Sequence, residues 1–408
     1  MTENPAFVIV GAGLAGAKAA QTLREEGFRG PVTLIGEELE RPYERPALSK
    51  DYLMGKAERE SLYVHPEGWY AEQDVDLRLG VEVTGLDPAA HEALLADGSR
   101  VGYARLLLAT GSSPRRLPVP GAGLDGVLYL RRVGDSDRIR EAFQAAKRIV
   151  VIGAGWIGLE AAAAARNAGV EVTVLETAEL PLLRVLGREV AQVFADLHRA
   201  HGVDLRLGVQ VAEITGVGGR ASGVRLSDGT QISADAVIAG IGITPNTQLG
   251  EAAGLEVSDG IRVDQSLRSS DPDIYAAGDV ASAYHPLLGR YIRVEHWANA
   301  LNQPQAAARS MLGQDVSYDL IPYFYTDQYD LGMEYAGYVE PGGYDEVLFR
   351  GDVGAREFIA FWLAGGRVLA GMNVNIWDVN DGIQALIRRG TPVDQGRLTD
   401  SAIPLAEV

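Results

Sequence analysis

Two stretches of the chain carry glycines at a spacing that suits phosphate binding. Each stretch reads Gly-x-Gly-x-x-Gly directly after a run of β-branched apolar residues, and the second begins 142 residues after the first: Gly11, Gly13 and Gly16, then Gly153, Gly155 and Gly158. In such a turn the first glycine makes a tight bend, the second lets the backbone approach a pyrophosphate, and the third lets a helix pack closely on a strand. The phosphates would then meet the unpaired N–H groups and the positive dipole end of that helix.

An acidic residue closes the next apolar strand in each copy. Glu37 and Glu176 follow the third glycine by 21 and 18 residues, which is near the spacing of a carboxylate that accepts hydrogen bonds from ribose hydroxyls. Because the flanking pattern is complete twice, we predict two dinucleotide sites rather than two ordinary glycine-rich turns. Thr177 and Ala178 offer no arginine for a 2′-phosphate after Glu176, which favours NADH over NADPH, although Arg184 lies near enough along the chain to reach one.

The elements that must position these residues are alternating strands and helices. Residues 7–37 and 148–176 each read as strand, helix and strand, with helices near 15–26 and 156–168. Each stretch is followed by short strands with an Asp-Gly turn and then by an apolar strand, at 103–109 and 236–241. The repeat predicts two similar nucleotide-binding domains. The remainder, 331–408, alternates strands with one clear helix at 379–389 and predicts a smaller α+β domain.

Several segments near strand ends could reach a ligand. Arg41–Lys50 is a proline-punctuated loop with three cations after the second strand, where ligands of such sheets bind, so we favour a cofactor role over a solvated connection. Ala109–Gly111 and Ala277–Val280 let backbone approach a ligand. Asp279 could accept from a polyol hydroxyl or could cap a helix. Glu160, two residues beyond the last glycine, either meets the dipole of the first helical turn or faces the reactive end of a ligand.

Composition excludes several classes of function. With 408 residues the chain can bury two or three cores, and no apolar run approaches the length of a membrane span. The absence of cysteine excludes thiolate catalysis and iron–sulfur ligation by the chain, so redox chemistry must use bound cofactors. A net charge of −18 argues against nucleic acid and anionic membranes as partners. Met1–Pro5 is polar and runs into a strand, so we expect no signal or transit peptide and a cytoplasmic location.

Two further patterns are discounted. His198 and His201 lie three residues apart, as helical metal ligands can, but they close a helix before Gly202, where positive side chains suit the helix dipole. With no obvious third ligand, we expect no metal site. The sequence also has no Gly-x-Ser-x-Gly elbow to indicate a hydrolase.

Taken together, these motifs resemble those of the FAD-dependent NADH:ferredoxin reductases of oxygenase systems, the family of putidaredoxin reductase and of the aromatic-ring dioxygenase reductases. The likeness covers essentially the whole chain, and its most discriminating segments are Pro-x-Leu-Ser-Lys, ending at Lys50, and Tyr-x-Asp-Gln, ending at Gln328. It implies a glutathione-reductase-like α/β fold with two Rossmann-like domains, for FAD and NAD, and a C-terminal α+β domain. The implied bounds are 1–114 with 245–320 for FAD, 115–244 for NAD, and 321–408 for the C-terminal domain.

The resemblance also implies the site residues. Lys50, Glu160 and Trp297 are expected at the reacting ends of the cofactors, with Lys50 beside the flavin and able to pair with Glu160. Glu37 and Asp279 would bind the ribose and ribitol of FAD, and Glu176 the ribose of NADH. The full expected set of cofactor-binding residues is Gly11, Gly13, Leu14, Ala15, Gly16, Glu37, Arg45, Lys50, Val83, Ala109, Thr110, Gly111, Arg131, Gly278, Asp279, Trp297, Gly153, Gly155, Ile157, Gly158, Glu160, Glu176, Arg184 and Gly242.

The implied activity takes a hydride from NADH onto FAD and passes electrons singly to a two-iron, two-sulfur ferredoxin that feeds a haem or Rieske-type oxygenase. Tyr323 and Tyr325 stand where similar reductases often carry tryptophans, in the segment that faces the partner. Such ferredoxins are commonly acidic, so docking needs a local basic patch, for which the candidates are Arg115, Arg116, Arg131, Arg132, Arg388 and Arg389.

Two alternatives are weighed against this activity. A disulfide reductase or NADH peroxidase shares the architecture but needs cysteines that this chain lacks. A redox-sensing flavoprotein resembling apoptosis-inducing factor would instead change its assembly when NADH reduces it. The sequence leaves the number of subunits open.

Overall fold

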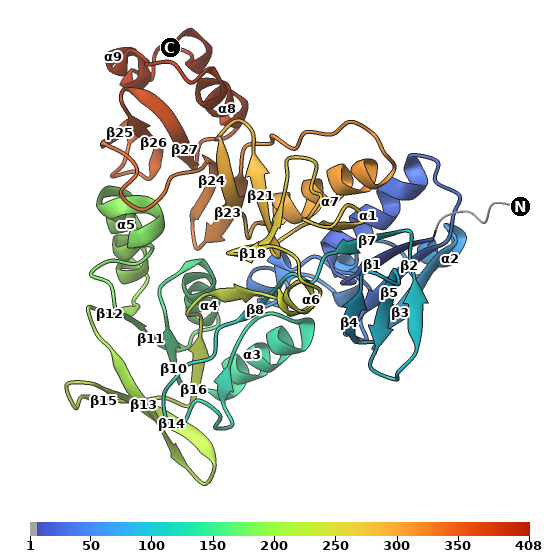
Figure 1. Cartoon of the computed structure of the whole chain (residues 1–408). Coiled ribbons are helices and arrows are strands. Elements are labelled where there is room, and N and C mark those ends of the chain that lie inside the picture. Colours follow the sequence, from blue (N-terminus) through green and yellow to red (C-terminus); the bar gives the residue numbers. More distant parts are fainter. Residues whose placement is uncertain (1–5) are drawn as a thin grey trace, which may run out of the picture. The chain divides into compact units, whose positions relative to one another are not determined.

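The computed structural model describes residues 6–408, which form two compact units (Figure 1). Unit 1 contains the described residues up to Glu44 together with Arg59–Ser113 and Thr244–Pro322. Unit 2 contains Arg45–Glu58, Pro114–Ile243 and Tyr323–Val408. Met1–Pro5, on which the expectation of no leader peptide rests, lie outside the described residues. The short strands β8 (Ser112–Pro114) and β17 (Ile243–Pro245) each contain a point where the chain changes unit.

Unit 1 is built on a parallel five-stranded sheet. The strand order is β20-β7-β1-β2-β3, with bounds Ile274–Ala276, Arg105–Leu108, Phe7–Val10, Val32–Gly36 and Val75–Leu79. The central strand β1 reads Phe-Val-Ile-Val and is buried along its whole length, as expected of a parallel sheet whose two faces are both covered. The helix that follows it, α1 (Leu14–Glu25), packs against α7 (Trp297–Met311).

Two smaller sheets complete unit 1. The first is antiparallel and contains β4 (Val83–Asp87), β5 (Glu92–Leu95) and β6 (Arg100–Gly102), with the predicted Asp-Gly turn between the last two. The second contains β18 (Val257–Ser258), β19 (Gly260–Val263), β21 (Ala281–His285) and β22 (Arg290–Arg293). The short helices of this unit are α2 (Trp69–Glu72), α6 (Gln248–Ala252) and the 3₁₀ turn η2 (Arg59–Leu62).

Unit 2 repeats the parallel sheet. Its strand order is β12-β11-β10-β16-β9, with bounds Asp204–Leu207, Glu171–Glu176, Arg148–Ile152, Ala236–Ala239 and Val127–Leu128. The strands β10, β11, β12 and β16 take the same places as β1, β2, β3 and β7 in unit 1. Only the fifth strand differs, because β20 follows the others along the chain whereas β9 precedes them. The predicted repeat of two nucleotide-binding folds is therefore confirmed in the strand order.

Helices and a small sheet surround this second parallel sheet. The helices are α3 (Val133–Ala145), α4 (Trp156–Asn167) and α5 (Leu183–Ala200), and the antiparallel sheet contains β13 (Val211–Val217), β14 (Arg220–Leu226) and β15 (Gln231–Ser233). The segment Arg45–Glu58 also belongs to this unit and contains the 3₁₀ turn η1 (Pro46–Ser49).

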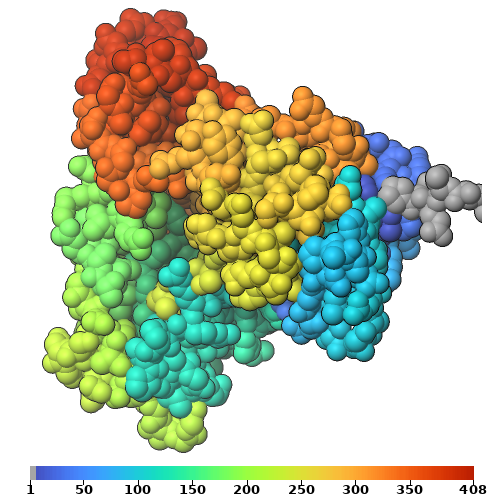
Figure 2. All heavy atoms as spheres, viewed as in Figure 1, coloured from blue at the N-terminus to red at the C-terminus, as the bar shows by residue number. Residues whose placement is uncertain are grey.

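The C-terminal residues form an antiparallel sheet in order β23-β24-β27-β26-β25, with bounds Tyr323–Gln328, Leu331–Gly337, Arg367–Val374, Glu357–Ala364 and Glu346–Asp352. The helix α8 (Asn380–Arg389) packs on β24 and β27, and α9 (Gln395–Thr399) and η3 (Leu405–Glu407) follow it. Phe194 of α5 and Trp362 of β26 belong to one buried cluster, and the Trp362 Nε1–H donates to the Leu186 carbonyl at 3.0 Å. Figure 2 shows the green atoms of the α5 region beside the orange and red C-terminal residues.

The predicted α/β fold with Rossmann-like sheets is confirmed, and two local predictions are corrected. The loop 41–50 contains the 3₁₀ turn η1, although its prolines predicted no regular structure. Helix α7 begins at Trp297 and contains Pro304 in its interior. The C-terminal region has a second helix, α9, in addition to the one at 380–389.

Candidate functional site

The glycine turns lie at the carboxyl ends of the central strands. Gly11 follows β1 and Gly13 precedes α1 in unit 1, while Gly153 follows β10 and Gly155 precedes α4 in unit 2. Neither α1 nor α4 has a side-chain cap or an acidic residue in its first turn. Each helix therefore offers its first N–H groups and its positive dipole end to an anion.

In unit 1, the three glycines differ in what a side chain would meet. A Cβ on Gly11 would lie 2.1 Å from the Ala109 carbonyl oxygen, and a Cβ on Gly16 would lie 2.0 Å from the Gly11 carbonyl oxygen. A Cβ on Gly13, in contrast, would have no atom of the chain within 4 Å, and its φ of −95° suits any residue. The fold requires the outer glycines, whereas the open space at Gly13 fits the approach of a phosphate.

Unit 2 repeats this geometry. A Cβ on Gly153 would lie 2.4 Å from the Gly240 carbonyl oxygen, and a Cβ on Gly158 would lie 2.0 Å from the Gly153 carbonyl oxygen. A Cβ on Gly155 would again meet nothing within 4 Å, at a φ of −79°. Both turns therefore leave open space at their middle glycine. The phosphate of a dinucleotide would fit this space.

Glu176 is bound to the second glycine turn. Its Oε2 accepts the Ala154 N–H at 2.7 Å, and its Oε1 accepts the Ala178 N–H at 2.9 Å and the Thr177 hydroxyl at 3.0 Å. The carboxylate is thus held at the end of β11 beside the glycine turn. Its counterpart Glu37 follows β2 and is exposed.

The strand ends of unit 1 are tied together by backbone and side-chain hydrogen bonds. The Thr110 hydroxyl donates to the Asn246 carbonyl at 2.9 Å, and the Asn246 amide donates to the Thr110 carbonyl at 2.8 Å. Gly111 has a φ of +65° and accepts the Asn246 N–H. The Ala-Thr-Gly segment singled out in the sequence is therefore fixed by Asn246, a residue that carried no sequence prediction of its own.

Asp279 lies in the same unit, at the turn between β20 and β21. Its Oδ2 accepts the Ser112 hydroxyl at 2.7 Å. Strand β21 follows Asp279, so the alternative of a helix cap is wrong. The Gly278 N–H donates to Gln303 Oε1 at 2.8 Å and is not available to a phosphate. The side chain of Trp297 donates its Nε1–H to a Glu44 carboxylate oxygen at 3.1 Å.

Lys50 and Glu160 form a buried ion pair in unit 2, as the resemblance implied. Lys50 Nζ lies 2.5 Å from Glu160 Oε1, and the two side chains are 13% and 4% exposed. The Ser49 hydroxyl donates to Glu160 Oε2 at 2.5 Å, and the Thr326 hydroxyl donates to Oε1. Three donors thus hold one carboxylate, which is how a buried charge is compensated in a protein. Glu160 lies beyond the first turn of α4, so the helix-dipole interpretation is wrong.

Two side chains of β23 add to the charge environment of this pair. Lys50 Nζ lies 5.5 Å from the ring centroid of Tyr325, within the range of a cation–π contact. Burial raises the pKa of Asp327, and the Lys50 ammonium opposes that rise. Lys50 is therefore surrounded by an aromatic face and two carboxyl groups, all of them within unit 2.

The structure also places the remaining predicted residues. Arg45 donates to the Arg131 carbonyl at 2.5 Å, which brings together two residues that are 86 apart in sequence. The other positions lie at the ends of elements: Leu14 and Ala15 begin α1, Val83 begins β4, Ile157 lies 43% exposed in the first turn of α4, Arg184 is exposed at the start of α5, and Gly242, with a φ of +98°, accepts the Arg115 N–H.

Sequence reasoning missed two partners of Glu160, Ser49 and Thr326. Both lie inside segments that the resemblance had already marked, because Ser49 precedes Lys50 and Thr326 lies in Tyr-x-Asp-Gln. The interpretation of His198 as a positive side chain at a helix end is wrong, since it is fully buried and burial lowers its pKa to about 4. Among residues 6–408, no group of three or more His, Cys, Asp or Glu side chains is placed to hold a metal ion.

Comparison with known proteins assigns the family. The model of the pyridine nucleotide-disulphide oxidoreductases matches residues 5–304, and a reductase C-terminal model matches residues 323–408. Putidaredoxin reductase CamA of Pseudomonas putida is 40% identical over all of this chain and 97% of its own length. The chain belongs to the pyridine nucleotide-disulphide oxidoreductase family. The ferredoxin–NAD(+) reductase component of the anthranilate 1,2-dioxygenase system of Burkholderia cepacia is 39% identical over 99% of both chains.

Solved structures agree with this assignment to the pyridine nucleotide-disulphide oxidoreductases. The reductase in a covalent putidaredoxin reductase–putidaredoxin complex has a TM-score of 0.95 and 40% identity, and the match covers 100% of this chain and 98% of the other. The ferredoxin reductase for the CYP199A2 system of Rhodopseudomonas palustris also has a TM-score of 0.95, with 37% identity and coverage of 99% and 100%. FAD and NAD(H) are accordingly the cofactors. No helix among the described residues has the length and apolar character needed to cross a membrane.

Proposed function

We propose that this chain takes a hydride from NADH onto FAD and passes electrons one at a time to a two-iron, two-sulfur ferredoxin that serves an oxygenase. The observation that carries the proposal is a complete disulphide-oxidoreductase framework in a sequence without a single cysteine. Because no thiol of the chain can receive the electrons, they must leave to a separate acceptor. The relatives named as ferredoxin reductases match this chain over nearly its whole length, which supports a ferredoxin as that acceptor.

In the proposal, unit 1 supplies the FAD site. The uncapped N-terminus of α1 and the open position at Gly13 would receive the pyrophosphate, with Glu37 on the ribose and Asp279 on the ribitol. Leu14, Ala15, Val83, Trp297 and the Ala109–Gly111 segment would complete its contacts within unit 1. The expected roles of Arg45 and Arg131 toward FAD rest on the resemblance, and both residues belong to unit 2. We further propose the functional domain bounds 1–114 with 245–320 for FAD, 115–244 for NAD, and 321–408 for the C-terminal domain.

Unit 2 would supply the NADH site by the same geometry. The space at Gly155 and the N-terminus of α4 fit the pyrophosphate, and the Glu176 carboxylate would accept from a ribose hydroxyl. A carboxylate at this place repels a 2′-phosphate, which favours NADH over NADPH. Ile157, Gly242 and Arg184 would border the same ligand.

The chain's own contribution to the reaction is positioning and charge. FAD, when bound, would accept one hydride, which carries two electrons, from NADH and could release those electrons singly, which a nicotinamide cannot do. Lys50 would stabilise negative charge on the reduced ring, and Glu160 would position the nicotinamide. The Ser49 and Thr326 hydroxyls keep the Glu160 carboxylate in one place, so that Lys50 and Glu160 meet their ligands in a fixed geometry.

An acidic ferredoxin would need a local basic surface on a chain whose net charge is −18. The six candidate arginines come from separate segments of unit 2: Arg115 and Arg116 before β9, Arg131 and Arg132 before α3, and Arg388 and Arg389 in the last turn of α8. The last two are exposed and lie in the region matched by the reductase C-terminal model, which supports them as docking residues.

The test mixes the purified holoprotein anaerobically with NADH, adds a two-iron, two-sulfur ferredoxin and follows both chromophores by stopped-flow absorbance. We expect fast bleaching of the flavin and then fast reduction of the ferredoxin. A long-lived reduced complex that no ferredoxin from a broad panel discharges would refute the proposal and would favour the redox-sensing alternative. A reduced state that changes the sedimentation of the protein would strengthen that alternative further.

A further inference from the structure

A row of buried polar side chains connects Glu160 with helix α5. Thr326 and Gln328 are two residues apart on β23 and therefore point to the same face of the strand. The Thr326 hydroxyl contacts Glu160, Gln328 Nε2 lies 3.4 Å from Thr326 Oγ1, and Gln328 Oε1 lies 2.8 Å from His198 Nε2. Thr326, Gln328 and His198 are each 1% exposed or less, so their polar groups must bond to one another.

The hydrogen-bond capacity of each group fixes the direction of the whole row. The Thr326 hydroxyl has one hydrogen and gives it to Glu160, so it can only accept from Gln328. The amide nitrogen of Gln328 therefore faces Thr326, and its oxygen faces His198. An amide oxygen only accepts, which requires His198 to carry its proton on Nε2.

The other ring nitrogen of His198 completes the assignment. Burial lowers the pKa of His198 to about 4, so the neutral ring has a single N–H and a bare Nδ1. The Tyr329 hydroxyl lies 3.5 Å from that Nδ1 and can donate to it. Every donor in the row then points toward Glu160, and such aligned hydrogen bonds strengthen one another.

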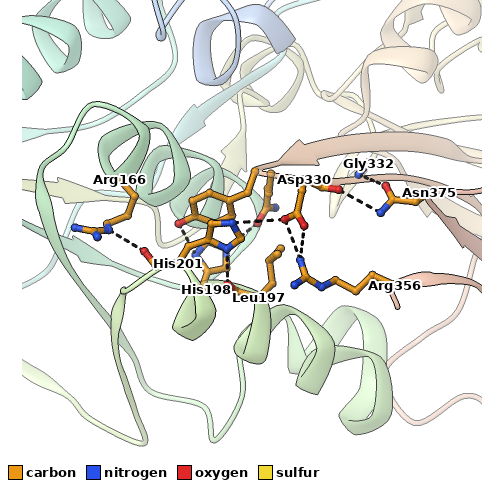
Figure 3. Close-up of polar contacts among 10 residues, drawn as sticks. Arg166, Leu197, His198, His201, Asp330, Gly332, Arg356 and Asn375 are labelled. Atoms are coloured by element: carbon orange, nitrogen blue, oxygen red, sulfur yellow. Dashed lines mark hydrogen bonds and ion pairs between the residues drawn. The ribbon is translucent and has the colours of Figure 1, made fainter. Parts of the chain in front are cut away.

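The end of α5 is anchored to the turn between β23 and β24, which keeps His198 in register (Figure 3). Tyr329, with a φ of +58° in that turn, stacks on His201 with 3.8 Å between ring centroids. Asp330 lies 3.5 Å from His201 Nε2 and also pairs with Arg356 at 2.9 Å. The close-up labels the two histidines and shows the contacts of Asp330 with His201 and Arg356.

We propose that His198 is a positioning residue for Glu160. Its Nε2–H orients Gln328, Gln328 orients the Thr326 hydroxyl, and that hydroxyl fixes the Glu160 carboxylate beside Lys50. His198 is fully buried and acts through Gln328 and Thr326, and the amide of Gln328 interrupts any path for a proton along this row. The geometric part of the inference stands on unit 2 alone, and its effect on hydride transfer rests on the proposed function.

The first test reads the tautomer directly. In the ¹⁵N-histidine-labelled holoprotein, two-bond ¹H–¹⁵N spectra should show His198 as the neutral Nε2–H form from pH 8 down to about pH 5. A neutral Nδ1–H ring or a charged ring at pH 7 would overturn the inference, whatever the protein reduces. This readout does not depend on NADH or ferredoxin.

The second test compares two isosteric variants by stopped flow. In His198→Gln, the new amide N–H takes the place of Nε2–H and can still donate to Gln328. In His198→Asn, the amide N–H takes the place of Nδ1, so the hydrogen bond to Gln328 is lost. We expect His198→Asn to slow flavin reduction by NADH about two- to tenfold, the effect of one hydrogen bond, with the NADH dissociation constant unchanged. His198→Gln should stay within twofold of the wild type.

A double-mutant cycle separates positioning from general structural damage. Thr326→Val removes the hydroxyl while keeping the shape, so adding His198→Asn to it should slow the reaction no further. The inference would be overturned if the double variant reduced its flavin more slowly than Thr326→Val by the full factor seen for His198→Asn alone. Equal rates for His198→Gln and His198→Asn would also overturn it. If the wild type itself fails to transfer a hydride from NADH, the proposed function has failed, and the tautomer measurement still decides the role of His198.

Discussion

The middle glycine of the second turn offers a sharp test of where the phosphate binds. Gly155 has an ordinary φ of −79°, and an added Cβ would meet no atom of the chain within 4 Å. Gly155→Ala should therefore leave the folded protein intact and change its free energy of unfolding by less than about 1 kcal/mol, because the restriction that alanine places on the unfolded chain opposes the loss of a glycine at the N-cap of α4. At Gly158, by contrast, the Cβ would lie 2.0 Å from a backbone oxygen, and Gly158→Ala should cost about 3 kcal/mol.

The effect of Gly155→Ala on NADH binding should be much larger than its effect on folding. The methyl group fills the space that the NADH pyrophosphate would take, so at least one charge-assisted hydrogen bond is lost. Such a bond contributes about 1.5–3 kcal/mol, which corresponds to a roughly ten- to hundredfold weaker NADH affinity. FAD content should stay at the wild-type level, because the FAD phosphates are expected at Gly13 in unit 1.

The assay pairs urea unfolding with NADH titration of the oxidised holoprotein followed by stopped-flow absorbance. Gly134→Ala is the matched control, since Gly134 lies near the start of α3 and a Cβ there also meets nothing within 4 Å. The control should change neither stability by more than about 1 kcal/mol nor NADH affinity. Unchanged NADH affinity in Gly155→Ala would refute the assignment of this turn to the NADH phosphates.

The remaining predictions concern charge. Lys50→Met leaves the buried Glu160 carboxylate without its cation and should lower the free energy of unfolding by about 3–5 kcal/mol in urea titrations, with partial recovery in Lys50→Met/Glu160→Gln. Glu176→Gln keeps an acceptor but removes the charge that repels a 2′-phosphate, so the ratio of kcat/KM for NADPH to that for NADH should rise about tenfold, equivalent to about 1.4 kcal/mol. The pKa of His198 is lowered to about 4 in the folded protein, from about 6.5 in the unfolded chain. As the pH falls from 6.5 toward 4, His198 is therefore protonated in the unfolded chain before it is protonated in the folded protein, and the free energy of unfolding decreases. At pH 5 this loss is about 2 kcal/mol relative to pH 7, and it should vanish in His198→Gln. Reversing Arg388 and Arg389 to glutamate should slow ferredoxin reduction and weaken its salt dependence, while NADH oxidation by a small dye stays constant.

Three of these predictions have outcomes that would contradict their reasoning directly. Equal destabilisation by Lys50→Met and by the double variant would mean that the buried charge is not the cause. An unchanged preference for NADH in Glu176→Gln would mean that residues other than Glu176 discriminate between NADH and NADPH. Equal slowing of dye and ferredoxin reduction by the arginine reversals would indicate damage to the flavin site rather than to docking.

Local pattern was enough to determine the two nucleotide-binding folds. The apolar runs at 7–10 and 148–152 followed by Gly-x-Gly-x-x-Gly predict strand, tight turn and helix, and all three form. The reason is that the outer glycines act over short range, against backbone a few residues away or on the neighbouring strand. Resemblance added the pairing of Lys50 with Glu160, although the two residues are 110 apart in sequence.

The sequence could not determine which groups surround that ion pair. The Thr326 hydroxyl reaches Glu160 only because β23 packs beside α4, and His198 joins the same row only because α5 meets the turn after β23. Read along the chain, His198 was a helix-end cation, whereas in the structure it is a buried neutral donor. Periodicity and spacing report what neighbours along the chain can do, but desolvation and hydrogen-bond direction depend on what packs against a side chain from distant segments. The glycine turns were therefore determined by the sequence, and the hydrogen-bond network around Glu160 by the tertiary structure.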